Sequence, residues 1–180
     1  MKDKIGRALM QWRLRVVLPN ISGKLLDIGC GTNELVCQYK GEGLGVDVFQ
    51  WGDVDLVVED SANLPFENKA FDTITIVAAL NHIPKRRAVL KEAHRVLSDQ
   101  GKIIVTMIPP LVSRIWHFLR EPWDADQNER GMKLGEVYGL STATVRDLLD
   151  DAGFSVIKEK RFMMGVNCLT IARKSSIVDG

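Results

Sequence analysis

The sequence has few cysteines, and none of them belongs to a recognisable pair. Cys30, Cys37 and Cys168 are the three cysteines in 180 residues, and they form neither a C-x-x-C motif nor a metal-ligand spacing. An odd and scattered set predicts free thiols in a reducing compartment, so we expect a cytoplasmic protein without a metal site. The N-terminus also lacks the apolar core and small-residue cleavage site of a secretory signal.

Long apolar runs and a surplus of charge of one sign are absent as well. No stretch approaches the roughly 18 apolar residues that predict a membrane span. The 24 Lys and Arg residues nearly balance the 23 Asp and Glu residues, which gives a formal net charge of +1. This balance argues against a protein that binds nucleic acid mainly through phosphates. With 46% hydrophobic and 26% charged residues, we expect one soluble globular domain over residues 1–180.

Apolar runs alternate with helical patterns along most of the chain. Parallel strands need long connections, and the helices between the strands provide them. The alternation therefore predicts right-handed crossovers, a parallel sheet and helices on both of its faces. Only a short connection joins the last two strands, so these two must be antiparallel. We therefore predict an α/β, Rossmann-like sheet of seven mostly parallel strands with one reversed C-terminal strand. The expected strands span residues 24–28, 45–49, 55–59, 71–80, 102–108, 154–161 and 166–172.

An amphipathic helix with many basic residues is predicted over residues 1–19, where Pro19 ends it. Such a helix packs on the domain with a solvated basic face, covers a bound ligand as a lid, or touches a membrane surface. Further helices are expected over residues 33–39 and 84–97, and from Ser141 or Thr142 onwards.

The alternation is interrupted over residues 109–140. This stretch has aromatic residues at its start and then a polar, irregular part without a strong period, which predicts a loop or a mobile lid. Trp116, Phe118, Trp123 and Met132 in this region suggest that a bound molecule has an apolar or aromatic part. The alternative is that these side chains form a hydrophobic cover over the edge of the sheet.

A glycine-rich turn follows the first predicted strand. The apolar run ends with Asp27, and Gly29 and Gly31 come directly before a helical pattern. Glycine lets the backbone turn sharply and approach a ligand, and the free N–H groups at a helix start can face an anionic or polar group. A Gly-x-Gly turn by itself is a weak indication, because many such turns bind nothing.

Acidic residues end three successive predicted strands. Asp47 lies about 18 residues beyond Gly29, close to the spacing at which an acid on the second strand meets ribose hydroxyls. Asp27 precedes the glycine turn, and Asp60 closes the third strand. Each acid alone could be a helix cap or part of a loop salt bridge. Together they predict a nucleotide site, because open α/β sheets bind ligands at the carboxyl ends of their strands.

These motifs and their order resemble the class I S-adenosylmethionine-dependent methyltransferases, in particular the small-molecule enzymes similar to ubiquinone and menaquinone C-methyltransferases. The resemblance covers roughly residues 20–173. It rests on Leu-Asp-Ile-Gly-Cys-Gly-Thr at 26–32, Gly-Val-Asp at 45–47, Asp-Ser-Ala-Asn-Leu-Pro-Phe at 60–66, Phe-Asp at 71–72, Glu-Ala-His-Arg-Val-Leu at 92–97 and Asp-Ala-Gly-Phe at 151–154.

The resemblance assigns two ends of a cofactor site. At the methionine end it implies Asp27, Gly29, Cys30 and Gly31, with backbone groups holding the amino and carboxylate groups of S-adenosylmethionine. Leu80, at the end of the fourth predicted strand, would lie close to the transferred methyl group.

At the adenosine end the resemblance implies five further residues. Asp47 would accept hydrogen bonds from both ribose hydroxyls, and Val48 would lie against the adenine. Asp60 would accept from the adenine amino group, with Ser61 and Ala62 beside the ring.

A nicotinamide dehydrogenase is the chief alternative within this fold. Its Gly-x-Gly-x-x-Gly motif requires a third glycine for close packing beneath a pyrophosphate, and this chain has Glu34 there. Two other hypotheses stay open. One is a non-catalytic or regulatory partner protein that binds S-adenosylmethionine, and the other is an RNA methyltransferase that uses the basic N-terminal helix.

His82 is the candidate general base, because it follows the fourth predicted strand at the mouth of the expected site. The alternative is that His82 caps the next helix or bonds to the backbone. The methyl group of a sulfonium is already activated, so we expect in-line transfer that depends chiefly on positioning. A base would assist a hydroxyl or an acidic carbon. We expect a small-molecule acceptor with an apolar or aromatic part, no nucleic acid partner and no metal.

Overall fold

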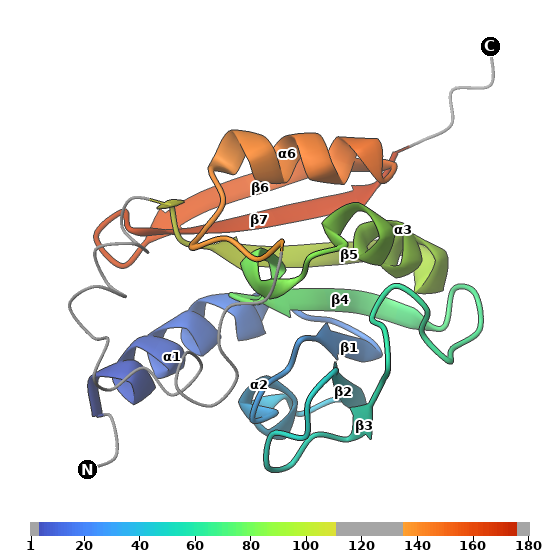
Figure 1. Cartoon of the computed structure of the whole chain (residues 1–180), viewed down its shortest axis with the longest axis horizontal. Coiled ribbons are helices and arrows are strands. Elements are labelled where there is room, and N and C mark those ends of the chain that lie inside the picture. Colours follow the sequence, from blue (N-terminus) through green and yellow to red (C-terminus); the bar gives the residue numbers. More distant parts are fainter. Residues whose placement is uncertain (1–3, 111–134, 176–180) are drawn as a thin grey trace.

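The computed structural model describes residues 4–110 and 135–175, and it places seven strands in one sheet (Figure 1). The strand order is β3-β2-β1-β4-β5-β7-β6. The strands are β1 (Leu25–Ile28), β2 (Gly43–Asp47), β3 (Leu56–Val57), β4 (Phe71–Val77), β5 (Leu97–Met107), β6 (Phe154–Phe162) and β7 (Asn167–Lys174). The α-helices of the described residues are α1 (Lys4–Val17), α2 (Glu34–Gln38), α3 (Arg86–Val96) and α6 (Thr142–Asp151).

The direction of the strands confirms the predicted topology. β1 pairs in parallel with β2 and β4, β2 with β3, and β4 with β5. β7 is antiparallel to both of its neighbours, β5 and β6. The sheet is therefore parallel except for one reversed strand, as the short connection between the last two strands requires.

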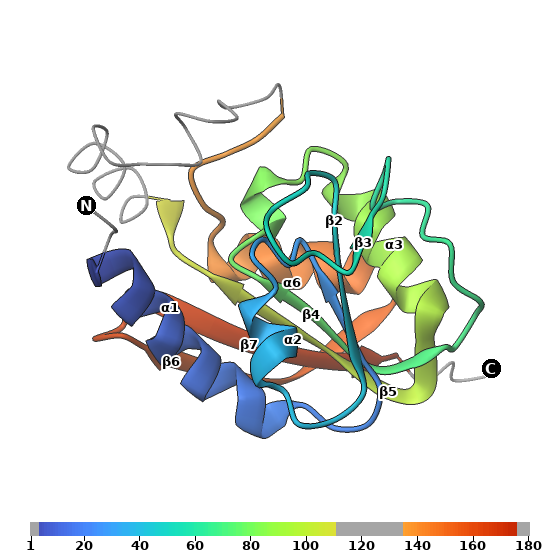
Figure 2. The same cartoon turned by 90° about the horizontal axis from the view of Figure 1, so that it is seen from below.

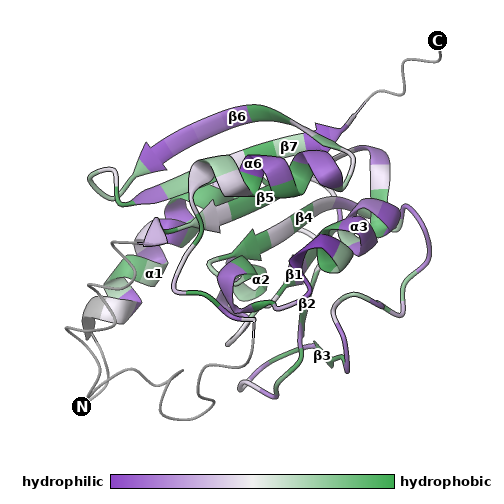
Figure 3. Cartoon of the chain, turned by 45° about the horizontal axis from the view of Figure 1, so that its top comes forward, coloured by the Kyte–Doolittle hydropathy of each residue, from purple (hydrophilic) through white to green (hydrophobic). Residues whose placement is uncertain are grey.

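Helices cover both faces of the sheet (Figure 2). One hydrophobic cluster contains Val89 and Leu90 of α3 and Leu149 of α6, and a second contains Leu14 of α1 and Leu35 of α2. Neighbouring residues of β5 point into different clusters, since side chains alternate between the faces of a strand. The edge strand β6 is largely hydrophilic on its outer positions, whereas the second half of β5 and most of β7 are buried (Figure 3).

Several strand boundaries differ from the prediction: β2 spans 43–47 rather than 45–49, β3 spans 56–57 rather than 55–59, and β5 begins at 97 rather than at 102. β4 ends at Val77 rather than at residue 80, because Ala78 has a φ of 54° and its N–H donates to Thr106. Leu80 therefore lies in a 3₁₀ turn, Leu80–His82, and not at the end of the strand. β5 begins at Leu97, where it already pairs with Phe71. Helix α3 therefore ends at Val96, one residue before the end of the helix predicted over residues 84–97.

The predicted lid falls mostly outside the described residues. Residues 111–134 are not described, and they include Trp116, Phe118, Trp123 and Met132. Residues 135–140, at the end of the interrupted region, are described and lead into α6, which Ser141 caps through the N–H of Thr144 as predicted. None of the helices in the described ranges combines the length and the apolar character needed to cross a membrane.

Candidate functional site

A cavity of about 670 Å³ opens at the carboxyl ends of β1, β2 and β4. Its wall is formed by the turn after β1, the end of β2, residues 59–61, residues 77–79, residues 82–85 and residues 136–138. The N-terminal helix α1 contributes Met10 and Arg13. This volume is in the range of small-molecule sites in proteins, and the position is the one at which open α/β sheets bind ligands.

Most of the sequence-predicted residues come together at this cavity. Those that line it are Gly29, Cys30, Gly31, Asp47, Val48, Asp60, Ser61 and His82. Asp27, Ala62 and Leu80 lie just behind the wall. Asp27 is buried and accepts a hydrogen bond from Thr75, Leu80 is fully buried, and the N–H of Ala62 donates to Asp60.

The turn after β1 requires glycine for two different reasons. Gly29 has a φ of 73°, and a Cβ at this position would lie 2.6 Å from the Cβ of Ala79. Gly31 has a φ of 55°, but a Cβ there would meet no atom within 4 Å. Gly31 thus borders open space in the cavity wall, so a ligand can approach the backbone closely at this point.

Asp47 is held in one orientation by two backbone groups. The N–H of Gly31 donates to Oδ2 at 3.0 Å, and the N–H of Phe49 donates to Oδ1 at 3.1 Å. The side chain is buried but lines the cavity. Each carboxylate oxygen has a second lone pair, so Asp47 can still accept from two neighbouring hydroxyls of a ligand.

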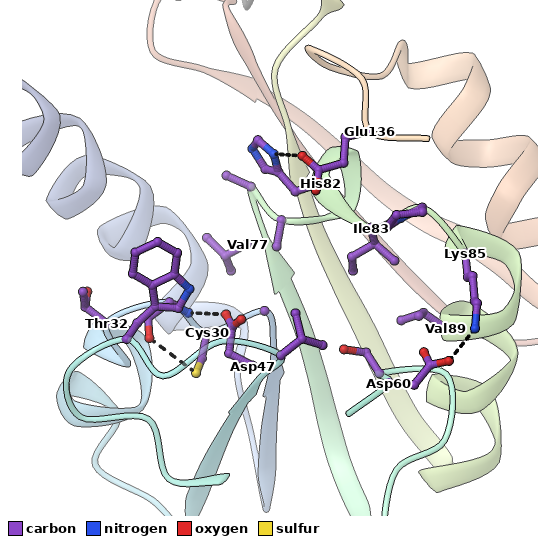
Figure 4. Close-up of a pocket in the computed structure, with 18 of the residues that line it drawn as sticks. Cys30, Thr32, Asp47, Asp60, Val77, His82, Ile83, Lys85, Val89 and Glu136 are labelled. Atoms are coloured by element: carbon purple, nitrogen blue, oxygen red, sulfur yellow. Dashed lines mark hydrogen bonds and ion pairs between the residues drawn. The ribbon is translucent and has the colours of Figure 1, made fainter. Parts of the chain in front are cut away.

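Asp60 lies on the opposite side of the cavity, next to α3 (Figure 4). Its Oδ1 accepts from the N–H of Ala62 at 2.9 Å, and its Oδ2 accepts from Nζ of Lys85 at 2.7 Å. These bonds, the one to Lys85 first, hold the pKa of Asp60 below its usual value. Asp60 is therefore a fixed carboxylate acceptor at neutral pH.

The loop that follows Asp60 is fixed to helix α3. Glu92 accepts from the N–H of Leu64 at 2.8 Å and pairs with Arg95. Arg95 in turn donates to the carbonyl oxygens of Leu64 and Phe66. The Glu-Ala-His-Arg motif of the sequence therefore does not contact the cavity itself but holds the loop that follows Asp60.

His82 and Glu136 meet at the rim of the cavity (Figure 4). Nδ1 of His82 lies 3.5 Å from Oε2 of Glu136, whose side chain is almost completely buried. A carboxylate next to Nδ1 favours the tautomer with the proton on that nitrogen, which leaves Nε2 able to accept a proton. The fold thus gives His82 an acidic neighbour that lies 54 positions away in the sequence.

Burial raises the pKa of two groups near the turn. Desolvation raises the pKa of Asp27 to about 7, against the effect of the hydrogen bond from Thr75 and with a contribution from Asp47. Burial and the neighbouring carboxylates also raise the pKa of the Cys30 thiol. The Cys30 thiol in the cavity wall is therefore neutral at neutral pH.

Several wall residues had no signal in the sequence that could identify them. Arg13, Trp51, Lys85, Glu136 and Tyr138 all line the cavity. Each comes from a segment whose own pattern predicts only a helix or a loop. Their place in the site depends on how those segments pack, which a single sequence does not reveal.

Comparisons with known proteins agree with this geometry. A family model described as "Methyltransferase domain" matches residues 26–105. A demethylmenaquinone methyltransferase of Staphylococcus epidermidis is 32% identical to this chain, in an alignment that covers 85% of this chain and 76% of that protein. A demethylmenaquinone methyltransferase of Thermotoga maritima is 27% identical, with 84% of this chain and 76% of that protein covered.

Solved structures show the same fold. The PH0226 protein from Pyrococcus horikoshii has a TM-score of 0.70 and 20% identity, with 97% of this chain and 93% of that chain covered. The 1,6-didemethyltoxoflavin-N1-methyltransferase of Burkholderia thailandensis, solved with 1,6-didemethyltoxoflavin and S-adenosylhomocysteine, has a TM-score of 0.67 and 16% identity. That alignment covers 95% of this chain and 83% of the other.

Proposed function

The chain belongs to the class I S-adenosylmethionine-dependent methyltransferases, and from this we propose that it moves a methyl group to a small-molecule acceptor by in-line transfer at the cavity beside Asp47. The observation that carries the proposal is the arrangement of Gly31, Asp47 and Asp60 around one cavity. Two fixed carboxylates and an open glycine turn form a wall that fits an adenosine and an amino-acid group.

The wall fits the proposed methyl donor in its chemistry. Asp47 has free lone pairs for two ribose hydroxyls, and Asp60 is a fixed acceptor for an amino group. Val48 gives an apolar surface next to Asp47, and the space above Gly31 admits a group close to the backbone. S-adenosylmethionine, when bound, supplies a methyl group that its sulfonium already activates, so the protein has chiefly to position the acceptor.

Leu80 keeps a role close to the reacting groups in this proposal, although its side chain lies behind the wall. Together with Asn81 it forms the buried part of the 3₁₀ turn that sets the position of His82. Asp27 has a comparable place behind the turn of Gly29. We propose that both residues shape the wall from the second layer and that Ala62 does so by its hydrogen bond to Asp60.

We propose His82 as the general base and Glu136 as the residue that positions it. Nε2 would accept a proton from the acceptor, and the resulting positive charge would be stabilised by the carboxylate of Glu136 next to Nδ1. A base at this point suits an acceptor that reacts through a hydroxyl or an acidic carbon. Removing such a base lowers turnover by about 10²–10⁴-fold.

An apolar or aromatic acceptor fits the rest of the wall. Met10, Trp51, Val77, Val137 and Tyr138 bring apolar and aromatic surface to the same cavity. The relatives from Staphylococcus epidermidis and Thermotoga maritima are named for demethylmenaquinone. A reduced naphthoquinone is therefore the first acceptor that we propose to test, as an example of an aromatic molecule with hydroxyl and carbon nucleophiles.

The test is formation of S-adenosylhomocysteine from S-adenosylmethionine with three kinds of acceptor: a reduced naphthoquinone, a panel of small phenols, and transfer RNA. Turnover with a small aromatic molecule, lowered by His82→Gln with unchanged S-adenosylhomocysteine binding, is the expected result. Turnover with RNA alone would favour the RNA methyltransferase hypothesis. Binding of the methyl donor without any turnover would favour a regulatory protein.

A further inference from the structure

Arg13 is a cation in the wall of the cavity, and its buried Nε has no partner among the described residues. Its Nε is buried and has no hydrogen-bond acceptor in the part of the chain that the structure describes. The residue as a whole is half-buried, and it lines the cavity. A buried guanidinium normally pairs with a carboxylate or several carbonyl oxygens, so an unpartnered one needs an explanation.

The packing of helix α1 fixes where Arg13 points. Leu14 and Val17 are buried in the cluster that also holds Leu35 of α2. Met10, one turn before Arg13, lines the cavity as well. Residues three and four apart share a helix face, so Met10, Arg13, Leu14 and Val17 lie on the side of α1 that faces the protein, with Met10 and Arg13 at its border with the cavity. Turning helix α1 about its axis so that Arg13 faced solvent would also move Val17 out of the apolar cluster.

None of the described residues forms an ion pair with Arg13. Burial lowers its pKa to about 10, with no contribution from a carboxylate in the described part of the chain. Among the acids that line the cavity, Asp60 pairs with Lys85, Glu136 lies next to His82, and Asp47 accepts from two backbone N–H groups. Arg13 is still protonated at neutral pH, so it remains a positive charge that faces the cavity. Arg15, two positions later in the same helix, is exposed, so another face of α1 is in contact with solvent.

We propose that Arg13 is the oxyanion-binding residue of this cavity and that it takes a carboxylate of a bound small molecule. Arginine suits this role, because its planar fork matches a carboxylate in a bidentate pair. The cavity then has acceptors for hydroxyl and amino groups at Asp47 and Asp60 and a cation at α1. A ligand with a polar, uncharged end and a carboxylate end fits this distribution of charge.

The carboxylate has two sources that share this chemistry. One is the amino-acid part of the methyl donor, in which case the inference rests on the function proposed above. The other is an acidic acceptor molecule that binds beside the donor. S-adenosylhomocysteine and methylthioadenosine separate them, because both contain the adenosine and a thioether but only the first has a carboxylate.

Calorimetric titration of wild type, Arg13→Gln, Arg13→Lys and the exposed control Arg15→Gln tests the proposal. If the donor supplies the carboxylate, Arg13→Gln weakens S-adenosylhomocysteine binding by roughly 10- to 100-fold and leaves methylthioadenosine unchanged, since hydrogen bonds to charged groups have that strength. Arg13→Lys retains part of the affinity, and Arg15→Gln retains all of it. If the acceptor supplies the carboxylate, S-adenosylhomocysteine and methylthioadenosine each bind all variants with equal affinity. Benzoate then binds to wild type that is saturated with S-adenosylhomocysteine, but not to Arg13→Gln in the same state.

The proposal is overturned if Arg13→Gln equals wild type with every probe, or if it weakens S-adenosylhomocysteine and methylthioadenosine by the same factor. The second outcome would mean that Arg13 only supports the fold. Failure of wild type to bind either adenosine ligand counts against the proposed function instead. In that case benzoate binding to the free protein, with and without Arg13, still decides on the anion site.

Discussion

Replacing Asp27 by asparagine is expected to remove a pH-dependent loss of stability. Asp27 is 2% exposed, and its burial raises its pKa from 3.8 to about 7. A shift of this size corresponds to about 4 kcal/mol of unfolding free energy, at about 1.4 kcal/mol for each pKa unit. Because the side chain is buried, no discount for solvent screening is needed.

The sign of the effect follows from proton binding. Between pH 4 and pH 7 the folded protein keeps a proton on Asp27, whereas the unfolded chain has lost it. The folded state therefore binds more protons, and the free energy of unfolding falls as the pH rises through this window. Asparagine has no ionisable group, so this part of the decline disappears in the variant. Its oxygen can still accept from Thr75, as the carboxylate oxygen does at 2.6 Å.

The measurement is urea unfolding of wild type and Asp27→Asn at several pH values between 4 and 8. The amide of asparagine has its own cost of about 1–3 kcal/mol if its N–H groups stay unpaired, but this cost does not depend on pH. The difference between variant and wild type should therefore shift by about 4 kcal/mol in favour of asparagine from pH 4 to pH 8. Taking the difference between the two proteins removes the contribution of all other titrating groups to the pH dependence of the unfolding free energy.

Glu67→Gln is the matched control, because it makes the same exchange of a carboxylate for an amide at an exposed position. Thr75→Val provides a second check. It removes the hydrogen bond that lowers the pKa of Asp27, so the decline of stability should extend to higher pH. A constant difference between Asp27→Asn and wild type across the whole range would refute the argument that burial keeps Asp27 protonated.

Three further changes test the site and its support. Gly29→Ala should lower the free energy of unfolding by about 1–3 kcal/mol in urea titrations, because the φ of 73° is strained for alanine and its Cβ would meet Ala79. Gly31→Ala should cost about 1 kcal/mol, because only its backbone conformation is strained, yet it should weaken S-adenosylhomocysteine binding measured by calorimetry. Arg95→Gln should weaken that binding as well, with faster hydrogen exchange at the N–H of Leu64, whereas unchanged exchange would show that the loop does not depend on this pair.

The topology of the sheet could be predicted because chain connections constrain it. Long helical crossovers allow parallel strands, and the short link between β6 and β7 allows only an antiparallel pair. The apolar stripe of α3 and the cap at Ser141 were also predictable, since each depends on residues that are close in sequence. Most of the architecture could therefore be predicted from patterns of residues that are close in the sequence.

The boundaries and the far wall of the cavity depend on tertiary contacts and could not be predicted. The end of β4 is set by Ala78, whose N–H bonds to Thr106 of the neighbouring strand. Arg13 lies at the cavity because the same side of α1 is packed, through Leu14 and Val17, in a cluster with Ile104 of β5 and Leu169 and Ile171 of β7. Glu136 reaches His82 from a segment with no clear period of its own. A pattern along one segment does not contain the packing partner that decides such positions.

The central claim is that Asp47 anchors the adenosine part of the methyl donor, and calorimetric titration with S-adenosylhomocysteine tests it most directly. Wild type, Asp47→Ala, Asp47→Asn and the exposed control Asp53→Ala are compared after their folding has been verified by circular dichroism. Two hydroxyl bonds to a carboxylate together contribute about 3 kcal/mol, so Asp47→Ala should weaken binding by about 100-fold. Asp53→Ala should bind like wild type. Equal affinity of folded Asp47→Ala and wild type would contradict the assignment of this cavity as the donor site.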